Sequence, residues 1–247
     1  MMQKHRGAGF TLIELMLAMS FVAMLLLAIA MILIHSGNLY NRGLTLKAIN
    51  QAGRDITDTL RRDFLQANAG KVSRQVADEK QAVIWARAGG EVRSGRFCLG
   101  DYSYVWNVPK VIAGEVTGGP GVIVESGGVR AGRPVNFARV IDPDGALCKV
   151  HPVTGKLPDT IDHTSLSHLL KPAQAGDVIL AVHSLGVKLL AHDGVSSGLF
   201  AVNITLGTSQ LESIDTANGS CKPPADGQAN IDFCAINNFD MIMRTNG

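Results

Sequence analysis

The chain contains one stretch that decides its fold, residues 10–34, which read FTLIELMLAMSFVAMLLLAIAMILI. Glu14 is the only ionisable side chain in this stretch, and Leu, Ile, Met, Val, Ala and Phe make up most of the rest. As a helix that rises about 1.5 Å per residue, the stretch is about 37 Å long. That length is enough to cross a hydrocarbon core of about 30 Å. We therefore predict a helix over residues 10–35 that spans a membrane.

The rest of the chain has the composition of a water-soluble protein. Its 247 residues suffice for one mid-sized domain in addition to an anchor. The formal net charge is only +2, so the sequence indicates no specific nucleic-acid partner. Lys4 and Arg6 precede the apolar stretch, and the positive-inside tendency keeps such residues on the cytoplasmic side. Everything after His35 is therefore expected on the outer side of the membrane.

The helix is predicted to continue past the membrane as an amphipathic segment, residues 36–70. Apolar or small residues recur there at spacings of three and four: Leu46, Ile49, Gly53, Ile56, Leu60, Phe64 and Ala67. The opposite face carries charged residues: Arg54, Asp55, Asp58, Arg61, Arg62 and Asp63. A helix from about Phe10 to about Ala69 is about 90 Å long, with Gly37 and Gly43 as weak points. Its apolar stripe needs a cover, which we expect the rest of this chain to provide.

Residues 71–247 are predicted to form an exported, β-rich globular domain. Short runs typical of strands alternate with Gly, Pro, Asn and Asp turn signals. The runs are Ala82–Arg87, Arg96–Trp106, Gly121–Glu125, Val135–Ile141, Val178–Leu190 and Leu199–Leu206. An antiparallel sheet laid on the amphipathic helix buries the apolar face of each. The predicted fold class is α+β, with a long N-terminal helix packed on this domain.

The four cysteines lie beyond the membrane stretch, on the side predicted to be exported. An even number in that position favours disulfides formed in an oxidising compartment. Four cysteines allow three connectivities. The short spacing of Cys221 and Cys234 makes their closure the easiest in entropy, which leaves Cys98 to pair with Cys148.

The residues around the start of the apolar stretch carry the functional signal: Gly7-Ala8-Gly9-Phe10-Thr11-Leu12-Ile13-Glu14-Leu15-Met16. An ordinary secretory signal is cut after its apolar stretch, whereas here the small residue Gly9 precedes it. A cut between Gly9 and Phe10 removes a leader, residues 1–9, and keeps the helix. Glu14 is costly inside a lipid-spanning helix, so it must become neutral or find a cation. The free amine of a neighbouring subunit's Phe10 is such a cation.

This segment resembles the N-terminal cleavage and methylation motif of type IV pilin-like proteins. The resemblance implies that a prepilin peptidase cuts after Gly9 and methylates the amine of Phe10. It also implies that Glu14 registers subunits during assembly and that pilus assembly machinery drives insertion into a fibre. The partners it implies are other pilin subunits, contacted through their N-terminal helices.

The residues from Tyr40 to Phe64 resemble, more loosely, PilW-like minor pilins and J-type minor pseudopilins. The resulting hypothesis is a structural and assembly subunit, a minor pilin, of a type IV pilus-like filament. Its alternatives are a minor pseudopilin of a type II secretion system and an adhesin or DNA-uptake subunit displayed on a filament. The chain is then expected in the cell membrane as a single-pass protein, and later in an extracellular pilus or an envelope pseudopilus.

The sequence gives little support for a metal site or for an enzyme active site. Cys148 and His151 have a ligand-like spacing, but no second pair completes a metal site. No nucleophile elbow or phosphate-binding loop is present. We therefore predict no catalytic residues, no metal and no cofactor, and a protein that is not an enzyme.

Overall fold

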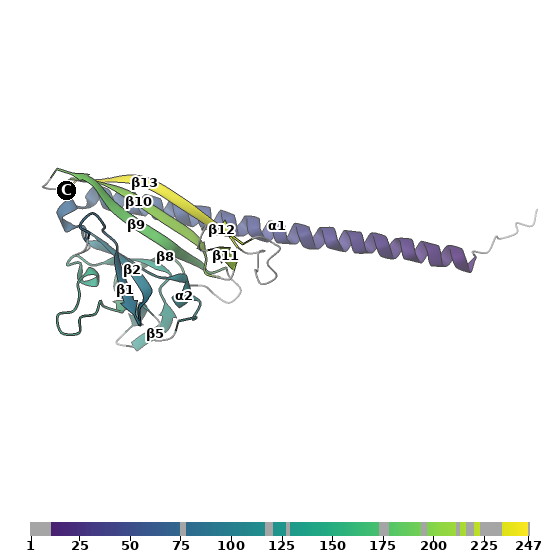
Figure 1. Ribbon diagram of the computed structural model, residues 1–247, viewed down its shortest axis with the longest axis horizontal. Coiled ribbons are helices and arrows are strands. Elements are labelled where there is room, and N and C mark those ends of the chain that lie inside the picture. The colour runs from purple at the N-terminus through teal and green to yellow at the C-terminus, as the bar shows by residue number, and fades with distance from the viewer. Residues whose placement is uncertain are drawn as a thin grey trace, which may run out of the picture.

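A computed structural model describes residues 11–74, 78–116, 121–126, 129–172, 178–193, 197–210, 213–215, 220–222 and 234–246. A single long helix, α1 (Leu12–Gln66), extends far out of a β-rich domain (Figure 1). The strands of the domain pair mostly in antiparallel fashion. The predicted α+β fold class is confirmed.

The elements that follow α1 alternate short strands with single turns of helix. In chain order they are η1 (Ala69–Lys71), β1 (Ile84–Ala88), β2 (Glu91–Leu99), β3 (Tyr102–Asn107), α2 (Pro109–Ile112), β4 (Ile123–Ser126), β5 (Val129–Pro134), β6 (Phe137–Ile141), η2 (Ala146–Cys148), β7 (Thr160–Asp162), η3 (His163–Ser165), β8 (Leu166–Leu170), β9 (Leu180–His192), β10 (Gly198–Thr208), β11 (Ile214–Asp215), β12 (Ser220–Cys221) and β13 (Ile236–Thr245).

Helix α1 is continuous, and only its second half touches the domain. Gly37 and Gly43 lie inside it without interrupting it, and no atom lies within 4 Å of a Cβ built on either. Most of the predicted stripe is buried, but Leu46 is 37% exposed and Thr45 is buried in its place. The buried helix residues are Thr45, Ile49, Gly53, Ile56, Leu60, Asp63 and Phe64.

Two sheets and α1 enclose the main core. One sheet has five strands in the order β1-β2-β3-β6-β8, and the other has three in the order β13-β10-β9. Phe64 of α1 reaches both, since its ring centroid lies 5.6 Å from that of Phe97 on β2 and 5.4 Å from that of Phe200 on β10. The helix therefore joins two sheets that share one apolar interior.

The far face of the five-stranded sheet is buried as well. Val105, Ala138 and Val140 pack there against residues from outside the sheet, including Val122 and Ile161. A small sheet in the order β5-β4-β7 supplies part of this cover. Because both faces of β3 are covered, its residues from Ser103 to Asn107 are all buried.

Every run predicted from sequence overlaps a strand of the structure, but one run was assigned wrongly and several strands were not predicted. The run Arg96–Trp106 is not one strand but parts of the hairpin β2–β3, which turns at Gly100, where φ is +63°. The other five runs overlap β1, β4, β6, β9 and β10. Strands β5, β7, β8, β11, β12 and β13 were not predicted. In β13 the outward positions carry Asn238 and Asp240, which lower its strand propensity.

Asp63 does not lie on the exposed charged face, as the helical spacing predicted. It is 1% exposed, and Arg139 of β6 donates two hydrogen bonds to it, at 2.6 Å from Nε and 2.9 Å from Nη2. The Tyr104 hydroxyl donates a third, at 2.5 Å, and the Arg139 guanidinium lies 3.3 Å above the ring of Tyr102.

The electrostatics of this cluster follow from its burial. Burial and the hydrogen bond to Asp63 raise the pKa of Tyr104. Burial alone lowers the pKa of Arg139, but the hydrogen bonds and charge of Asp63 leave it above its ordinary value. The carboxylate is thus held between a guanidinium and a neutral phenol, and the ion pair joins the helix to the five-stranded sheet.

Replacing Asp63 with Asn should destabilise the protein by about 2 kcal/mol, because Arg139 would keep its charge in a partly buried site without a counter-ion. Asp58→Asn on the same helix is the matched control, since Asp58 is exposed, and should change stability by less than about 0.5 kcal/mol. Denaturant unfolding of the full chain in detergent measures both. Equal, small effects would contradict the structural role assigned to Asp63.

Replacing Gly53 with Ala should destabilise the protein by about 1–3 kcal/mol. A Cβ at this position overlaps the ring of Phe239 on β13, and that clash outweighs the gain of about 1 kcal/mol in helix propensity. Gly43→Ala is the control, because nothing lies near its Cβ, and it should stabilise the helix instead. Thermal unfolding of the two variants should therefore shift in opposite directions.

Candidate functional site

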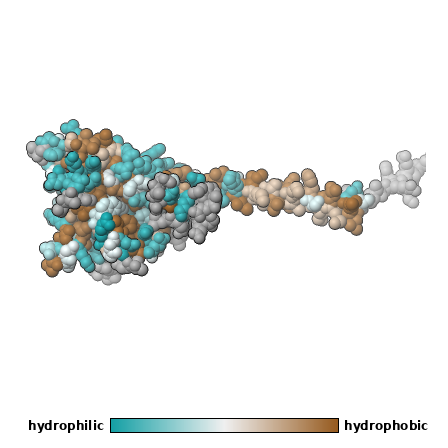
Figure 2. All heavy atoms as spheres, viewed as in Figure 1, coloured by the Kyte–Doolittle hydropathy of each residue, from teal (hydrophilic) through white to brown (hydrophobic). Residues whose placement is uncertain are grey.

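The N-terminal half of α1 is the candidate site, since it carries the described part of the predicted motif. Figure 2 shows it as a rod of hydrophobic residues that leaves the domain. Its large apolar side chains, from Leu12 to Ile34, are 44–76% exposed. The part of the chain that the structure describes therefore leaves this surface without a cover.

Within the described residues, α1 is the one helix long and apolar enough to cross a membrane. Its most apolar window is not buried at all by the rest of the chain, unlike the core helix of a soluble protein. This arrangement is compatible with a single-pass membrane protein. Thr45 is the first residue of the helix that is buried.

A reciprocal capping box closes the start of α1. The Glu14 carboxylate accepts hydrogen bonds from the Thr11 backbone N–H at 2.9 Å and from the Thr11 hydroxyl at 2.8 Å. In return, the Thr11 Oγ1 accepts one from the Glu14 backbone N–H at 3.3 Å. These bonds satisfy backbone donors that a helix start otherwise leaves without partners.

From the sequence, the Glu14 carboxylate was expected to become neutral or to find a cation. The structure adds a local contact to these two arrangements, in which Thr11 binds the carboxylate. The Thr-x-x-Glu spacing is itself a capping signal and predicts this contact. The predicted cleavage residues, Gly9 and Phe10, lie outside the described residues.

The first disulfide joins β2 to η2. Cys98 and Cys148 are bonded, with their Cα atoms 6.2 Å apart. Asp142 prepares this contact, because its carboxylate accepts hydrogen bonds from the backbone N–H groups of Ala146 and Leu147 at 2.8 and 3.0 Å. It also accepts one from the Ser103 hydroxyl on β3 at 2.7 Å. The short helix that carries Cys148 is thereby fixed on the sheet.

The second disulfide joins Cys221 of β12 to Cys234, with their Cα atoms 5.9 Å apart. Cys234 is buried and precedes β13, the strand against which α1 packs most extensively. Both pairings are those that loop entropy favours. The second bridge ties the outer strand of the three-stranded sheet to the segment before it.

Among the described residues, no group of three or more His, Cys, Asp or Glu side chains is arranged to hold a metal ion. Cys148 is in the disulfide, so the ligand-like spacing of Cys148 and His151 does not form a site.

Comparison of the chain with protein-family models, with curated proteins and with solved structures finds no match in any of the three.

Removing the two disulfides should cost different amounts of stability. In the chain-entropy model, the pair Cys98–Cys148, separated by 50 residues, contributes about 4 kcal/mol. The pair Cys221–Cys234, separated by 13 residues, contributes about 3 kcal/mol. Paired Cys→Ser variants, compared by denaturant unfolding, measure this order. Peptide mapping without reduction checks the connectivity, and a peptide that links Cys98 to Cys221 would contradict it.

Proposed function

We propose that this protein is a subunit of a type IV pilus-like filament and acts as a minor pilin in its assembly. The observation that carries the proposal is the exposed apolar half of α1, which begins with a carboxylate in its first turn. Lipid covers this surface while the chain is a membrane protein. Apolar helices of neighbouring subunits cover it in a filament.

Only the second half of α1 packs on the domain, which supports a transfer of the first half from lipid to a bundle of helices. The domain is anchored on the second half of the helix, from Thr45 to Gln66, and by two disulfides. The first half contributes no buried residue to that domain. A subunit can therefore leave the membrane and enter a helical bundle while its domain stays folded.

Glu14 is suited to recognising a neighbour. Thr11 holds the carboxylate at the helix start, and a carboxylate has room for further hydrogen bonds. Cleavage before Phe10 leaves the Thr11 N–H as a peptide amide, so the capping box is kept in the processed chain. The new amine of a neighbouring Phe10 would then meet a carboxylate whose position is already set.

The mature chain is expected to begin at Phe10 with a methylated amine. Gly9 precedes the apolar stretch, and the leader before it carries the positive charges of Lys4 and Arg6. Mass spectrometry of the protein purified from membranes or sheared fibres determines this end. An intact Met1, or a cut after Ile34, would overturn the proposal. Gly9→Leu should accumulate as an uncut precursor in the membrane.

Replacing Glu14 with Gln should lower the amount of the protein in sheared fibres by about tenfold, because it removes the charge that attracts a neighbour's amine in a region of low dielectric. Gln keeps an oxygen acceptor for the Thr11 N–H, so the helix start is preserved. The domain should remain folded, oxidised and present in the membrane.

Thr11→Val is the matched control for this test. It removes the hydroxyl of the capping box and keeps the charge of Glu14. Its incorporation into fibres should stay near the wild-type amount. If the two variants lost incorporation equally, the role of Glu14 would be to cap the helix and not to register subunits.

The pseudopilin and the displayed adhesin or DNA-uptake subunit remain alternatives within the same class. Deletion of the gene separates them from a minor pilin. Loss of fibres supports an assembly subunit, loss of attachment or uptake with fibres intact supports a displayed binding module, and loss of protein secretion supports a pseudopilin.

A further inference from the structure

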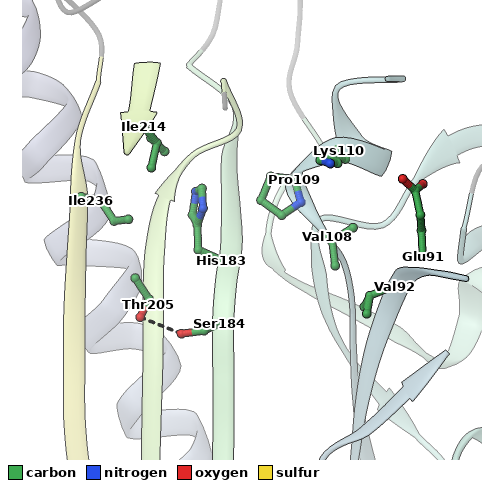
Figure 3. A pocket seen from close by; sticks show the side chains of 10 residues that line it. All are labelled: Glu91, Val92, Val108, Pro109, Lys110, His183, Ser184, Thr205, Ile214 and Ile236. Atoms are coloured by element: carbon green, nitrogen blue, oxygen red, sulfur yellow. Dashed lines mark hydrogen bonds between the residues drawn. The ribbon is translucent and has the colours of Figure 1, made fainter. Parts of the chain in front are cut away.

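Strand β13 forms an open edge of the three-stranded sheet. The strand order is β13-β10-β9, and no strand among the described residues pairs with the outer side of β13. Figure 3, a close view beside β9, shows this order: Ile236 of β13 lies outside Thr205 of β10, which lies outside Ser184 of β9. Strand β13 contains neither Pro nor Lys, the residues that most often keep a further strand from pairing with an edge.

The opposite edge of the same sheet is covered by the chain itself. Residues 80–82 lie along β9, where the Leu189 N–H donates a hydrogen bond to the Lys80 carbonyl at 2.8 Å. The Ala82 N–H likewise donates to the Val187 carbonyl at 2.9 Å. The fold therefore covers the β9 edge, whereas the described residues provide no such cover for the β13 edge.

The pairing between β10 and β13 identifies the backbone groups on the open edge. The Thr208 N–H donates to the Ala235 carbonyl at 3.0 Å, and the register that follows has no shift. Ala235 and every second residue after it therefore face β10. The residues between them, including Asp240, Ile242 and Arg244, direct their N–H and C=O groups to the open edge. Their side chains are exposed on the outer face of the sheet.

Asn238 limits the free part of this edge. Its N–H also points outward, but the Asn237 side-chain oxygen accepts a hydrogen bond from it at 2.9 Å. Further along, the N–H groups of Asp240, Ile242 and Arg244 have no such acceptor within the described part of the chain. The free segment is therefore residues 240–244.

The outward side chains of this segment place opposite charges on either side of an apolar centre. Ile242, at the centre, is 67% exposed. The Asp240 carboxylate accepts hydrogen bonds from the amides of Asn203 and Asn238, which are neutral, so its charge has no counter-ion there. Arg244 is exposed and forms no ion pair within the described ranges. The segment thus offers an anion, an apolar side chain and a cation in a row.

A second copy of this chain does not fit the edge. Asn237 and Phe239 of β13 contact Asn50 and Gly53 of α1 in the same order, so strand and helix run in the same direction (Figure 1). Antiparallel pairing of two β13 strands would point their N-terminal helices in opposite directions, which two copies that cross one membrane cannot do. Parallel pairing in register would set like charges opposite each other.

We propose that the open edge of β13 binds an extended segment of another polypeptide as an added antiparallel strand. The segment exchanges backbone hydrogen bonds with Asp240, Ile242 and Arg244. Opposite charges and apolar pairs directly across two strands stabilise their pairing. The segment therefore reads acidic–x–apolar–x–basic from its N-terminus, with the acidic residue opposite Arg244. The proposal does not depend on the filament function, because no residue of the edge belongs to α1.

The first experiment titrates two capped peptides, TETVTKT and TKTVTET, into the full chain in detergent. Both have the same composition. Centred on Ile242, the first sets Glu opposite Arg244 and Lys opposite Asp240, whereas the second sets like charges opposite each. Fluorescence anisotropy should give a Kd on the order of 0.1 mM for TETVTKT and about tenfold weaker binding for TKTVTET. Equal binding of the two peptides, or no binding of TETVTKT, overturns the proposal.

N-methylation of TETVTKT tests whether its backbone pairs with β13. The central valine directs its N–H towards Ile242, so a methyl group on that nitrogen should weaken binding about tenfold or more. The threonine after it directs its N–H away from β13. N-methylation of that threonine is the matched control and should change the Kd by less than about twofold. Equal effects of the two methyl groups would contradict strand addition.

Variants of the protein then locate the edge. In Arg244→Glu the two peptides should bind about equally, because each now has one favourable and one unfavourable charge pair. Lys188→Glu is the matched control, since it makes the same change of charge at an exposed position of β9, away from the β13 edge. It should keep the preference for TETVTKT. An undiminished preference in Arg244→Glu would show that the peptides bind elsewhere.

Sedimentation of the full chain tests a second copy as the occupant. Residues 240–244 read DMIMR, which has the proposed order of charges, and a detergent micelle does not fix the direction of the N-terminal helices. The chain should stay monomeric at the concentrations of the titrations. Dimers that TETVTKT dissociates would identify a second copy as the occupant and overturn the proposal. Failure of the peptides to bind leaves the proposed filament function unaffected.

Discussion

The structure depends on the burial of one helical stripe between two sheets. Ile49, Ile56, Leu60 and Phe64 of α1 are completely buried, and Phe64 touches aromatic rings from both sheets. Neither sheet can complete the shared core by itself, since the helix supplies residues to the same apolar cluster as both. The position of the helix is therefore the condition under which the domain folds. The N-terminal half of the helix contributes no buried residue to this core.

The ion pair of Asp63 and Arg139 fixes the position of the helix along this apolar contact. Apolar stripes alone allow related packings one helical turn, or about 5.4 Å, apart. A two-bonded ion pair allows one arrangement, because any shift would leave a charge buried without its partner. Such a pair adds little net stability, but it determines how much of α1 extends beyond the domain. In the proposed filament, that length would set the distance between the domain and the bundle of helices.

The start of α1 is arranged before any partner arrives. The backbone N–H and the hydroxyl of Thr11 donate hydrogen bonds to the Glu14 carboxylate and hold it in place. A carboxylate can accept further hydrogen bonds, so Glu14 keeps acceptor capacity for a cation.

Local patterns of the sequence determined the long helix, its apolar first half and the α+β class, because these depend on residues close together in the chain. Two disulfides also followed from spacing and loop entropy. The tertiary structure alone decided the burial of Asp63, because Arg139 and Tyr104 come from strands far along the chain and override its place on a charged face. It also decided strand β13, whose Asn238 and Asp240 face solvent while Phe239 packs on Gly53.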